Sequence, residues 1–181
     1  MLQTENLRLI PAAVELAEAL ANYYHRNRAF LRPFEPERPE IYFTADYQKE
    51  LLAKQMKDAE EKTDFRFYLQ PIEAPHRIIG SIALNNVIWG PFCSAFLGYK
   101  LDAEYLNRGY MTAAVGILTQ YAFSQLGLHR LEANVMPRNR ASMRVLEKNG
   151  YENEGLAKRY LNINGVWEDH IHMVKRSDDE R

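Results

Sequence analysis

The seven residues Leu106-Asn107-Arg108-Gly109-Tyr110-Met111-Thr112 stand directly before a stretch with the apolar spacing of a helix. The first turn of a helix leaves backbone amides without partners and carries a partial positive charge. Gly109 has no Cβ to obstruct a phosphate, Arg108 adds a cation, and Thr112 adds a hydroxyl group. The segment therefore predicts a binding site for an anion such as pyrophosphate.

Taken alone, this loop is a modest signal, because one glycine before a helix is common in ordinary turns. No Gly-Lys-Thr or Gly-Lys-Ser follows Gly109, which excludes a Walker-type phosphate loop. Two of the three glycines of the dinucleotide-binding fingerprint are also missing. On spacing alone, a plain turn and an anion site both stay open.

Four other polar residues fall at the start of, or inside, predicted elements. Asn139 is a good N-cap for a helix, and Ser142 follows it by one turn. Glu132 lies in the middle of a predicted strand, 130–135. Asp169 shares the alternating phase of apolar residues on its own strand, where an acid needs a hydrogen-bonding partner or a function.

The histidines and the cysteine predict no metal site. His170 and His172 share one face of a predicted strand, but no third ligand is spaced with them, so we expect a surface pair. Cys93 is the only cysteine, which excludes an intramolecular disulfide. A reducing compartment, the cytoplasm, is therefore expected.

Composition excludes several classes of protein. The chain of 181 residues fits one domain, and its 23 basic and 24 acidic residues give a net charge of −1. This balance argues against a broad basic surface that reads nucleic acid. No signal peptide is recognisable, and no apolar run approaches the roughly 20 residues needed to cross a membrane.

The elements that must position the candidate residues follow from the apolar pattern. It predicts strands at 7–10, 65–69, 77–88, 94–101 and 130–135, two closing strands joined by Asn164-Gly165, and helices at 12–28, 45–62, 112–125 and 139–149. Short turns between consecutive strands indicate antiparallel pairing, and the helix between two strands indicates a parallel crossover. The expected fold class is α+β, a three-layer αβα arrangement of a mixed, mostly antiparallel twisted sheet with helices on both faces. One domain covers residues 1–176, and residues 177–181 form a polar tail.

A proline-rich segment follows the first helix. Its three prolines within seven residues, 33–39, forbid a regular helix. Such a loop is either a surface connection or the lip of a binding site. In the second case Phe34, Glu35 and Glu37 are candidate substrate-binding residues, because the two acids could receive a cationic peptide terminus.

Four segments in fixed order resemble the GCN5-related N-acetyltransferase (GNAT) superfamily. They are Leu97-Gly98-Tyr99-Lys100-Leu101, Asn107-Arg108-Gly109-Tyr110-Met111-Thr112-Ala113-Ala114, Asn139-Arg140-Ala141-Ser142 and Glu147-Lys148-Asn149-Gly150-Tyr151. Segments 22–36, 129–137 and 155–170 are similar to its ribosomal-protein N-terminal (alanine) acetyltransferases, the RimJ-like branch. The superfamily writes its loop Q/R-x-x-G-x-G/A, and only Gly109 fits strictly, since Leu106 and Met111 depart from it.

The resemblance implies that strand 94–101 separates from its neighbour and that acetyl-CoA, as co-substrate, lies in the opening. The cofactor-binding residues that it implies are Leu97, Gly98, Tyr99, Asn107, Arg108, Gly109, Tyr110, Met111, Thr112 and Asn139, with no metal. An amine would attack the thioester directly. The tyrosine that many members use to protonate the thiolate corresponds to Leu146, so Ser142 is the candidate for this role. Glu132 is the candidate base and Asp169 its alternative.

The implied activity is transfer of the acetyl group to the N-terminal α-amine of a ribosomal or other protein. An α-amine has an ordinary pKa near 8 and a lysine near 10.4, so the lack of an obvious strong base favours an α-amine. Two alternatives stay open. One is an acetyltransferase for a small amine such as a polyamine, an amino acid or a drug, and the other is a non-catalytic CoA-binding or ribosome-associated module. A monomer or a homodimer is expected.

Overall fold

The computed structural model describes residues 2–178, and its strands form one sheet of eight in the order β1-β2-β3-β4-β5-β6-β8-β7. The strands are β1 (Leu2–Gln3), β2 (Leu7–Pro11), β3 (Phe65–Pro71), β4 (Gly80–Ile88), β5 (Ser94–Leu101), β6 (Arg130–Val135), β7 (Glu152–Ile163) and β8 (Val166–Arg176). The α-helices are α1 (Ala17–Leu31), α2 (Ala45–Glu60), α3 (Tyr110–Ser124) and α4 (Arg140–Lys148). Three short 3-10 helices are η1 (Val14–Leu16), η2 (Glu40–Phe43) and η3 (Ala103–Tyr105).

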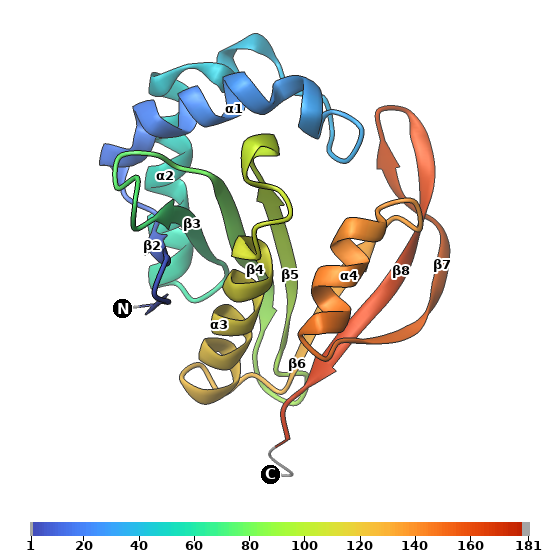
Figure 1. Cartoon of the computed structure of the whole chain (residues 1–181). Coiled ribbons are helices and arrows are strands. Elements are labelled where there is room, and N and C mark those ends of the chain that lie inside the picture. Colours follow the sequence, from blue (N-terminus) through green and yellow to red (C-terminus); the bar gives the residue numbers. More distant parts are fainter. Residues whose placement is uncertain (1, 179–181) are drawn as a thin grey trace.

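The pairing of the strands confirms the predicted mixed, mostly antiparallel sheet. Neighbouring strands are antiparallel except β5 and β6, which run parallel and are joined through α3. Helices α3 and α4 cover one face of the sheet, and α1 and α2 cover the other (Figure 1). We call these the α3/α4 face and the α1/α2 face. Within residues 2–178, no helix is long and apolar enough to span a membrane.

Strand β3 contributes side chains to the cores on both faces of the sheet. Leu69 is fully buried in the core beneath α3, whereas the adjacent Tyr68 is buried beneath α1 and α2. Successive side chains of a strand point to opposite faces. Tyr68 lies opposite Ser81, and Ser81 lies opposite Lys100, so the register places Ser81 and Lys100 on the α1/α2 face as well.

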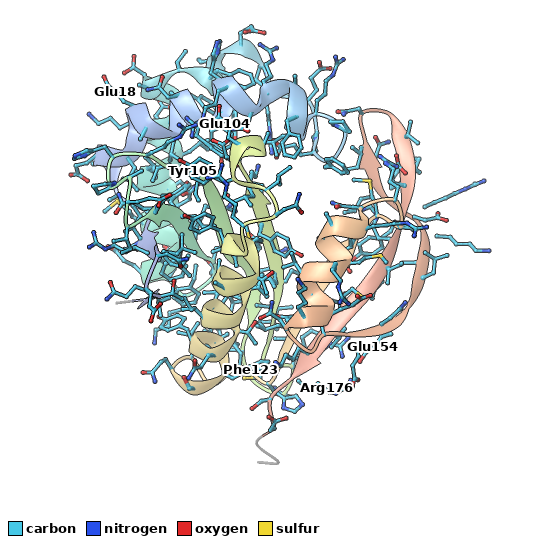
Figure 2. The ribbon with its side chains drawn as sticks, in the orientation of Figure 1. Glu18, Glu104, Tyr105, Phe123, Glu154 and Arg176 are labelled. Atoms are coloured by element: carbon cyan, nitrogen blue, oxygen red, sulfur yellow. The ribbon has the colours of Figure 1, made fainter. Side chains whose placement is uncertain are left out.

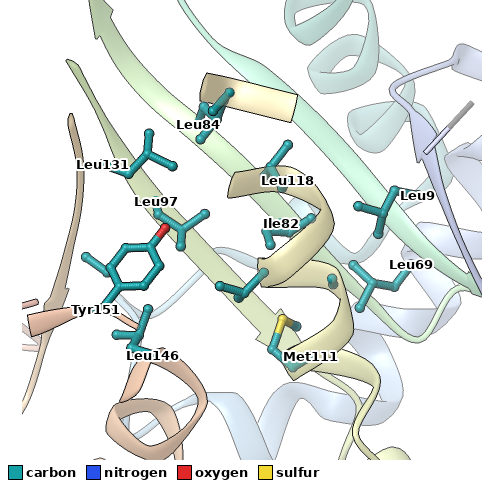
Figure 3. Packing of buried hydrophobic residues seen from close by; sticks show 14 of the residues in the cluster. Leu9, Leu69, Ile82, Leu84, Leu97, Met111, Leu118, Leu131, Leu146 and Tyr151 are labelled. Atoms are coloured by element: carbon teal, nitrogen blue, oxygen red, sulfur yellow. The ribbon is translucent and has the colours of Figure 1, made fainter. Parts of the chain in front are cut away.

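The core beneath α3 and α4 is built from aliphatic, methionine and tyrosine side chains, among which leucine is the most frequent. Figure 3 shows Leu97 and Tyr151 approaching from β5 and from the end of α4, with Leu118 of α3 nearby. Full burial of one leucine side chain stabilises a fold by about 1.5–3 kcal/mol. The hydroxyl of Tyr151 is 2.8 Å from the hydroxyl of Thr119, so this buried polar group has a partner.

Strands β5 and β6 separate soon after they begin to pair. Only three residue pairs link them, of which the last is Phe96 opposite Glu132. Strand β5 then continues to Leu101 and β6 to Val135 without pairing with each other. We call the space between residues 97–101 and 133–135 the β5–β6 opening.

Asp102 fixes the chain where it leaves β5. This carboxylate is buried, and its Oδ2 accepts a hydrogen bond of 2.7 Å from Nε of Arg26 on α1. Its Oδ1 accepts one of 3.1 Å from the amide of Glu104, and Asn27 accepts one of 3.0 Å from the amide of Ala103. Burial alone would raise the pKa of Asp102, but the hydrogen bonds from Glu104 and Arg26 outweigh it and hold that pKa below its ordinary value.

Several predicted boundaries shift in the structure. Helix α1 begins at Ala17 rather than residue 12, because η1 takes up the residues before it, and β4 begins at Gly80 rather than residue 77. Strand β1 was not predicted, since two residues are too few to show a strand pattern. The predicted hairpin turn is confirmed, and Asn164 and Gly165 both have the positive φ of a type I′ turn.

The predicted tail lies mostly outside the described residues, which end at 178. Ser177 is described, and its amide donates a hydrogen bond of 2.8 Å to the carbonyl of His129.

Replacing Asp102 by asparagine should lower the free energy of unfolding at pH 7 by roughly 2 kcal/mol, less than the full loss of a buried pair because Arg26 partly reaches solvent. The depressed pKa means that this stabilisation is present above pH ~4 and is lost as the pH falls through the folded-state pKa. In urea unfolding, the difference in the free energy of unfolding between the native protein and the Asp102→Asn variant should therefore become smaller below pH ~4. The matched control is Glu104→Gln, an exposed carboxylate in the same segment, and an equal effect there would contradict the prediction.

Candidate active site

The loop between β5 and α3 presents a row of free backbone amides. Asn107 and Gly109 both have positive φ, at 60° and 81°, which turns the chain sharply into α3. No acceptor among residues 2–178 bonds the amides from Asn107 to Thr112, and the first bonded amide of the helix is that of Ala113, 3.0 Å from the carbonyl of Gly109. A Cβ on Gly109 would meet nothing within 4 Å, so the space above the loop is open. Such an array attracts an anion.

The side chains of this loop do not all face that space. Arg108 lies over the ring of Tyr105, which Figure 2 labels, with 4.9 Å between its guanidinium carbon and the ring centre. Tyr110 and Met111 are buried in the core, with 6% and 5% of their surface exposed. Their side chains are therefore unavailable, and only their amides can contact an anion. Met111 packs in the hydrophobic core, as Figure 3 shows, which explains why a large residue fits there.

The β5–β6 opening receives side chains from two elements on the α3/α4 face. Leu97 and Tyr99 of β5 point toward this face, where Leu97 joins the core. The hydroxyl of Tyr99 lies 2.8 Å from Oγ of Ser142 on α4 and also donates to the carbonyl of Ser142 at 3.1 Å. The structure thus brings together two of the residues singled out from the sequence.

The Tyr99 and Ser142 hydroxyls are kept in place by the cap of α4 and by burial. Oδ1 of Asn139 accepts a hydrogen bond of 3.2 Å from the amide of Ser142, so Asn139 is the N-cap of α4 as predicted. Burial raises the pKa of Tyr99, and the hydrogen bond with Ser142 offsets this only in part. Tyr99 therefore stays protonated and can donate to Ser142. Leu146, which the resemblance placed at the position of a tyrosine, is fully buried in the core.

Glu132 is tied to two neighbours on the α1/α2 face. Its Oε1 lies 2.7 Å from Nδ1 of His172, and its Oε2 accepts a hydrogen bond of 3.0 Å from Nη2 of Arg130. Its side chain is 16% exposed. Glu132 thus lies where β5 and β6 stop pairing, but its carboxylate oxygens already have partners.

The structure gives Asp169 the hydrogen-bonding partner that it was expected to need, and it corrects the expectation for one of the histidines. Oδ1 of Asp169 accepts a hydrogen bond of 2.8 Å from the amide of Arg159, within the bulge of β7, which is a structural role. The expected surface pair of histidines is wrong for His170, which is 3% exposed and contacts the carbonyl of Glu168 at 3.0 Å. Across residues 2–178, no three His, Cys, Asp or Glu side chains gather in a way that could hold a metal ion.

The proline-rich loop touches the tip of the β7–β8 hairpin, as Figure 1 shows. Asn164 at the tip accepts a hydrogen bond of 2.7 Å from the amide of Glu37 and donates one of 3.3 Å to the carbonyl of Glu35. The carboxylate of Glu35 pairs with Lys100, and that of Glu37 lies 3.4 Å from Arg32. Glu35 thus already has a partly buried partner, whereas the side chain of Glu37 is 61% exposed and Phe34 is 38% exposed.

A polar cavity of ≈ 360 Å³ lies on the α1/α2 face and reaches Gly98 of β5. Oγ of Ser81 is buried there without a partner among residues 2–178. A Cβ on Gly98 would come within 3.0 Å of Nδ2 of Asn85, so a larger residue would crowd this wall. The residues that line the cavity include Tyr24, Tyr42, Gln48, Ser81, Asn85 and Lys100. None of these residues was predicted to line a site. The sequence feature that could have indicated the cavity is the presence of the polar residues Ser81 and Asn85 within the otherwise apolar strand β4.

Together these features form one site that passes through the sheet. Free amides and a hydroxyl pair lie on the α3/α4 side of the β5–β6 opening, and a polar cavity lies on the other side. The arrangement can bind an elongated anionic ligand along β5 and bring a second molecule to its end from the opposite face.

Comparisons with known proteins agree with this architecture. The family model described as "Acetyltransferase (GNAT) domain" matches residues 6–152. The "Probable N-acetyltransferase YjcK" of Bacillus subtilis is 38% identical over 182 residues, which cover 100% of each chain. The Ribosomal-protein-S5-alanine acetyltransferase of Vibrio fischeri superposes with a TM-score of 0.94 at 36% identity, over 99% of this chain and 97% of the other.

A second solved structure contains CoA. It is RimJ of Mycobacterium smegmatis in complex with CoA-disulfide, with a TM-score of 0.88 and 26% identity, over 96% of this chain and 86% of that chain. The family model covers most of the sequence, and the relatives match it almost from end to end. The chain therefore belongs to the GNAT family and is an N-acetyltransferase.

Proposed function

We propose that this enzyme transfers the acetyl group of acetyl-CoA to the N-terminal α-amine of a protein, in particular a ribosomal protein. The observation that carries the proposal is the row of free amides at the start of α3, set beside the β5–β6 opening. In support, the Vibrio fischeri relative is an alanine acetyltransferase for a ribosomal protein.

Acetyl-CoA would lie along β5 with its pyrophosphate at the amides of residues 107–112. The free edge of residues 97–99 would bond the amides of the pantetheine arm, as a neighbouring strand would. Arg108 adds positive charge, and the second polar group of Asn139 is available to the same ligand. The thioester would then reach the opening between Tyr99 and Ser142.

The acceptor amine attacks the thioester carbonyl carbon, and the electrons of the C=O bond move to the oxygen. A backbone amide near Leu97 to Tyr99 can stabilise this oxyanion. When the C–S bond breaks, its electron pair stays on sulfur, and Ser142 gives the thiolate a proton. Tyr99 remains protonated and holds the Ser142 hydroxyl in place. Glu132, at the last pair of the β5–β6 ladder, contributes to removal of the amine proton.

The acceptor would approach through the cavity on the α1/α2 face. Phe34, Glu35 and Glu37 would lie along its path, because the proline-rich loop contacts the cavity wall through the Glu35–Lys100 pair. Because Glu35 is paired with Lys100, its role is to position this wall of the cavity rather than to bind the amine. An α-amine is neutral more often than a lysine at pH 7, which suits a site without a strong, free carboxylate base.

An acetylation screen tests the substrate class. Peptides that vary in their first residue, the same peptides with a blocked N-terminus and an internal lysine, and a panel of polyamines and amino acids are incubated with acetyl-CoA. Mass spectrometry should detect acetylation of free N-termini with a small first residue. Preference for small amines would favour a small-molecule enzyme, and binding of CoA without acetylation would favour a non-catalytic module.

Replacing Gly109 by alanine should raise the KM for acetyl-CoA about tenfold, because its Cβ enters the space above the free amides and its positive φ is strained. The measurement is steady-state kinetics with the peptide at saturation. Gly127→Ala is a matched control, since Gly127 has a φ of +70° and equally open surroundings. A similar rise in KM for both variants would contradict an anion site at residues 107–112.

Replacing Ser142 by alanine should lower kcat about 100-fold and leave the KM for acetyl-CoA nearly unchanged, because the thiolate then lacks its proton donor. Tyr99→Phe should lower kcat less, since it removes only the group that holds Ser142. The control is Ser124→Ala, an exposed serine that bonds its own helix. Unchanged kcat in Ser142→Ala would exclude Ser142 as the acid.

A further inference from the structure

We propose that His172, oriented by Glu132, is the base that takes the proton from the acceptor amine, and that Asn134 binds that amine. The inference rests on the proposed function and assigns the proton acceptor within the same site. It follows from the face of the sheet on which these side chains lie, from the partners of Glu132, and from the groups left without a partner.

The register of the sheet places His172 beside the acceptor side of the opening. Leu131, Ala133 and Val135 of β6 are buried in the core on the α3/α4 face. The alternate residues Glu132 and Asn134 therefore point to the α1/α2 face, which also holds the polar cavity.

Asn134 and His172 lie next to the opening itself. The last pair between β5 and β6 is Phe96 with Glu132. Asn134 lies two residues further along β6, on the same face as Glu132, and Gly98 lies two residues further along β5, across the opening. Asn134 is directly opposite His172 on β8. Gly98 lines the cavity. The cavity therefore borders this stretch of the opening on the β5 side, and Asn134 and His172 border it on the β6 side.

Glu132 is better placed to orient a base than to be one. One carboxylate oxygen accepts a hydrogen bond from Arg130, and the other meets Nδ1 of His172 at 2.7 Å. A carboxylate beside Nδ1 keeps the proton on that nitrogen and leaves a lone pair on Nε2. Among residues 2–178, Nε2 of His172 has no hydrogen-bonding partner.

The surroundings of His172 leave it accessible. Its partner on β7 is Gly155, which has no side chain, and His172 is 24% exposed. The ring of Tyr160 packs edge-on against it at 5.0 Å and also contacts His170. The charged groups around His172 on this face include Glu132 and Arg130 of β6. Glu154 of β7 pairs with Arg130 at 2.6 Å and also with Arg176 of β8.

Asn134 offers an unused hydrogen-bonding group at the opening. Its Nδ2 donates to the hydroxyl of Tyr160 at 3.4 Å, and its Oδ1 is buried without a partner among the described residues. Buried polar atoms normally have a partner, so this atom indicates that a ligand group completes it. An amine N–H is a suitable donor.

The proton balance is complete with these groups. The amine nitrogen forms a bond to the carbonyl carbon, and Nε2 of His172 takes the proton that this nitrogen loses, directly or through one water. Sulfur leaves with the C–S electron pair and takes its proton from Ser142. The products are the amide and the CoA thiol, and solvent returns the two side chains to their starting states. Imidazole and an α-amine have ordinary pKa values within about 1.5 units of each other, whereas a lysine lies about 4 units above imidazole.

The test compares His172→Gln, whose amide can still donate to Glu132, with the native enzyme on an alanine-first peptide. At pH 7, kcat/KM should fall about 100-fold, and the deficit should shrink to about tenfold or less at pH 9.5, where most α-amines are already neutral. Glu132→Gln should lose only about tenfold at pH 7, because it orients the base. His129→Gln, on an exposed loop residue, is the matched control and should be unchanged.

The possible results distinguish failure of this inference from failure of the proposed function. Added imidazole should restore activity to His172→Ala but not to Ser142→Ala. A loss in His172→Gln that is the same at every pH, or no loss at all in an active enzyme, would overturn the inference and leave the function standing. A larger loss in Glu132→Gln than in His172→Gln would make Glu132 itself the base. If the native enzyme binds CoA but acetylates no amine, the proposed function fails and this inference fails with it.

Discussion

The separation of β5 from β6 after three residue pairs is the constraint on which the site depends. A parallel pair inside a sheet would normally continue and satisfy the amides and carbonyls along both strands. Here the strands diverge, and residues 97–101 keep a free edge in the middle of the protein. This edge directs the chain to the start of α3, where a second set of amides is also free. An extended ligand with its own amides and an anionic end would complete both sets.

The two-residue period of β5 divides the chemistry between the faces of the sheet. Tyr99 points to the α3/α4 face and reaches Ser142, while the next residue, Lys100, points to the α1/α2 face and pairs with Glu35. The same period on β6 buries Val135 in one core and exposes Asn134 to the other side. Two reactants can therefore meet at the opening without sharing a binding surface.

Contacts between distant segments keep these parts in place. Asp102 ties the end of β5 to α1 through Arg26, and this bond sets the direction in which the chain enters the amide loop. Asn164 ties the hairpin tip to the proline-rich loop. Helix α1 and the loop that follows it are thereby fixed both to the segment that precedes α3 and to the last two strands.

The sequence by itself determined the order of the α-helices and of the strands after β1, the mixed sheet, the hairpin at Asn164-Gly165 and the cap at Asn139, because these depend on local periodicity, turn geometry and capping. It also indicated the loop around Gly109, since a glycine before a helix is a local feature. Only the tertiary structure decided that Tyr110 and Met111 are core residues, that Glu35 is paired, and that Asp169 holds a bulge. The Tyr99–Ser142 pair joins residues 43 positions apart, the Glu132–His172 pair residues 40 apart, and the Glu35–Lys100 pair at the cavity residues 65 apart. Such contacts leave no trace in local spacing. The physical reason is that a strand pattern specifies the face of a residue, whereas the strand beside it and the side chain it meets depend on the whole sheet.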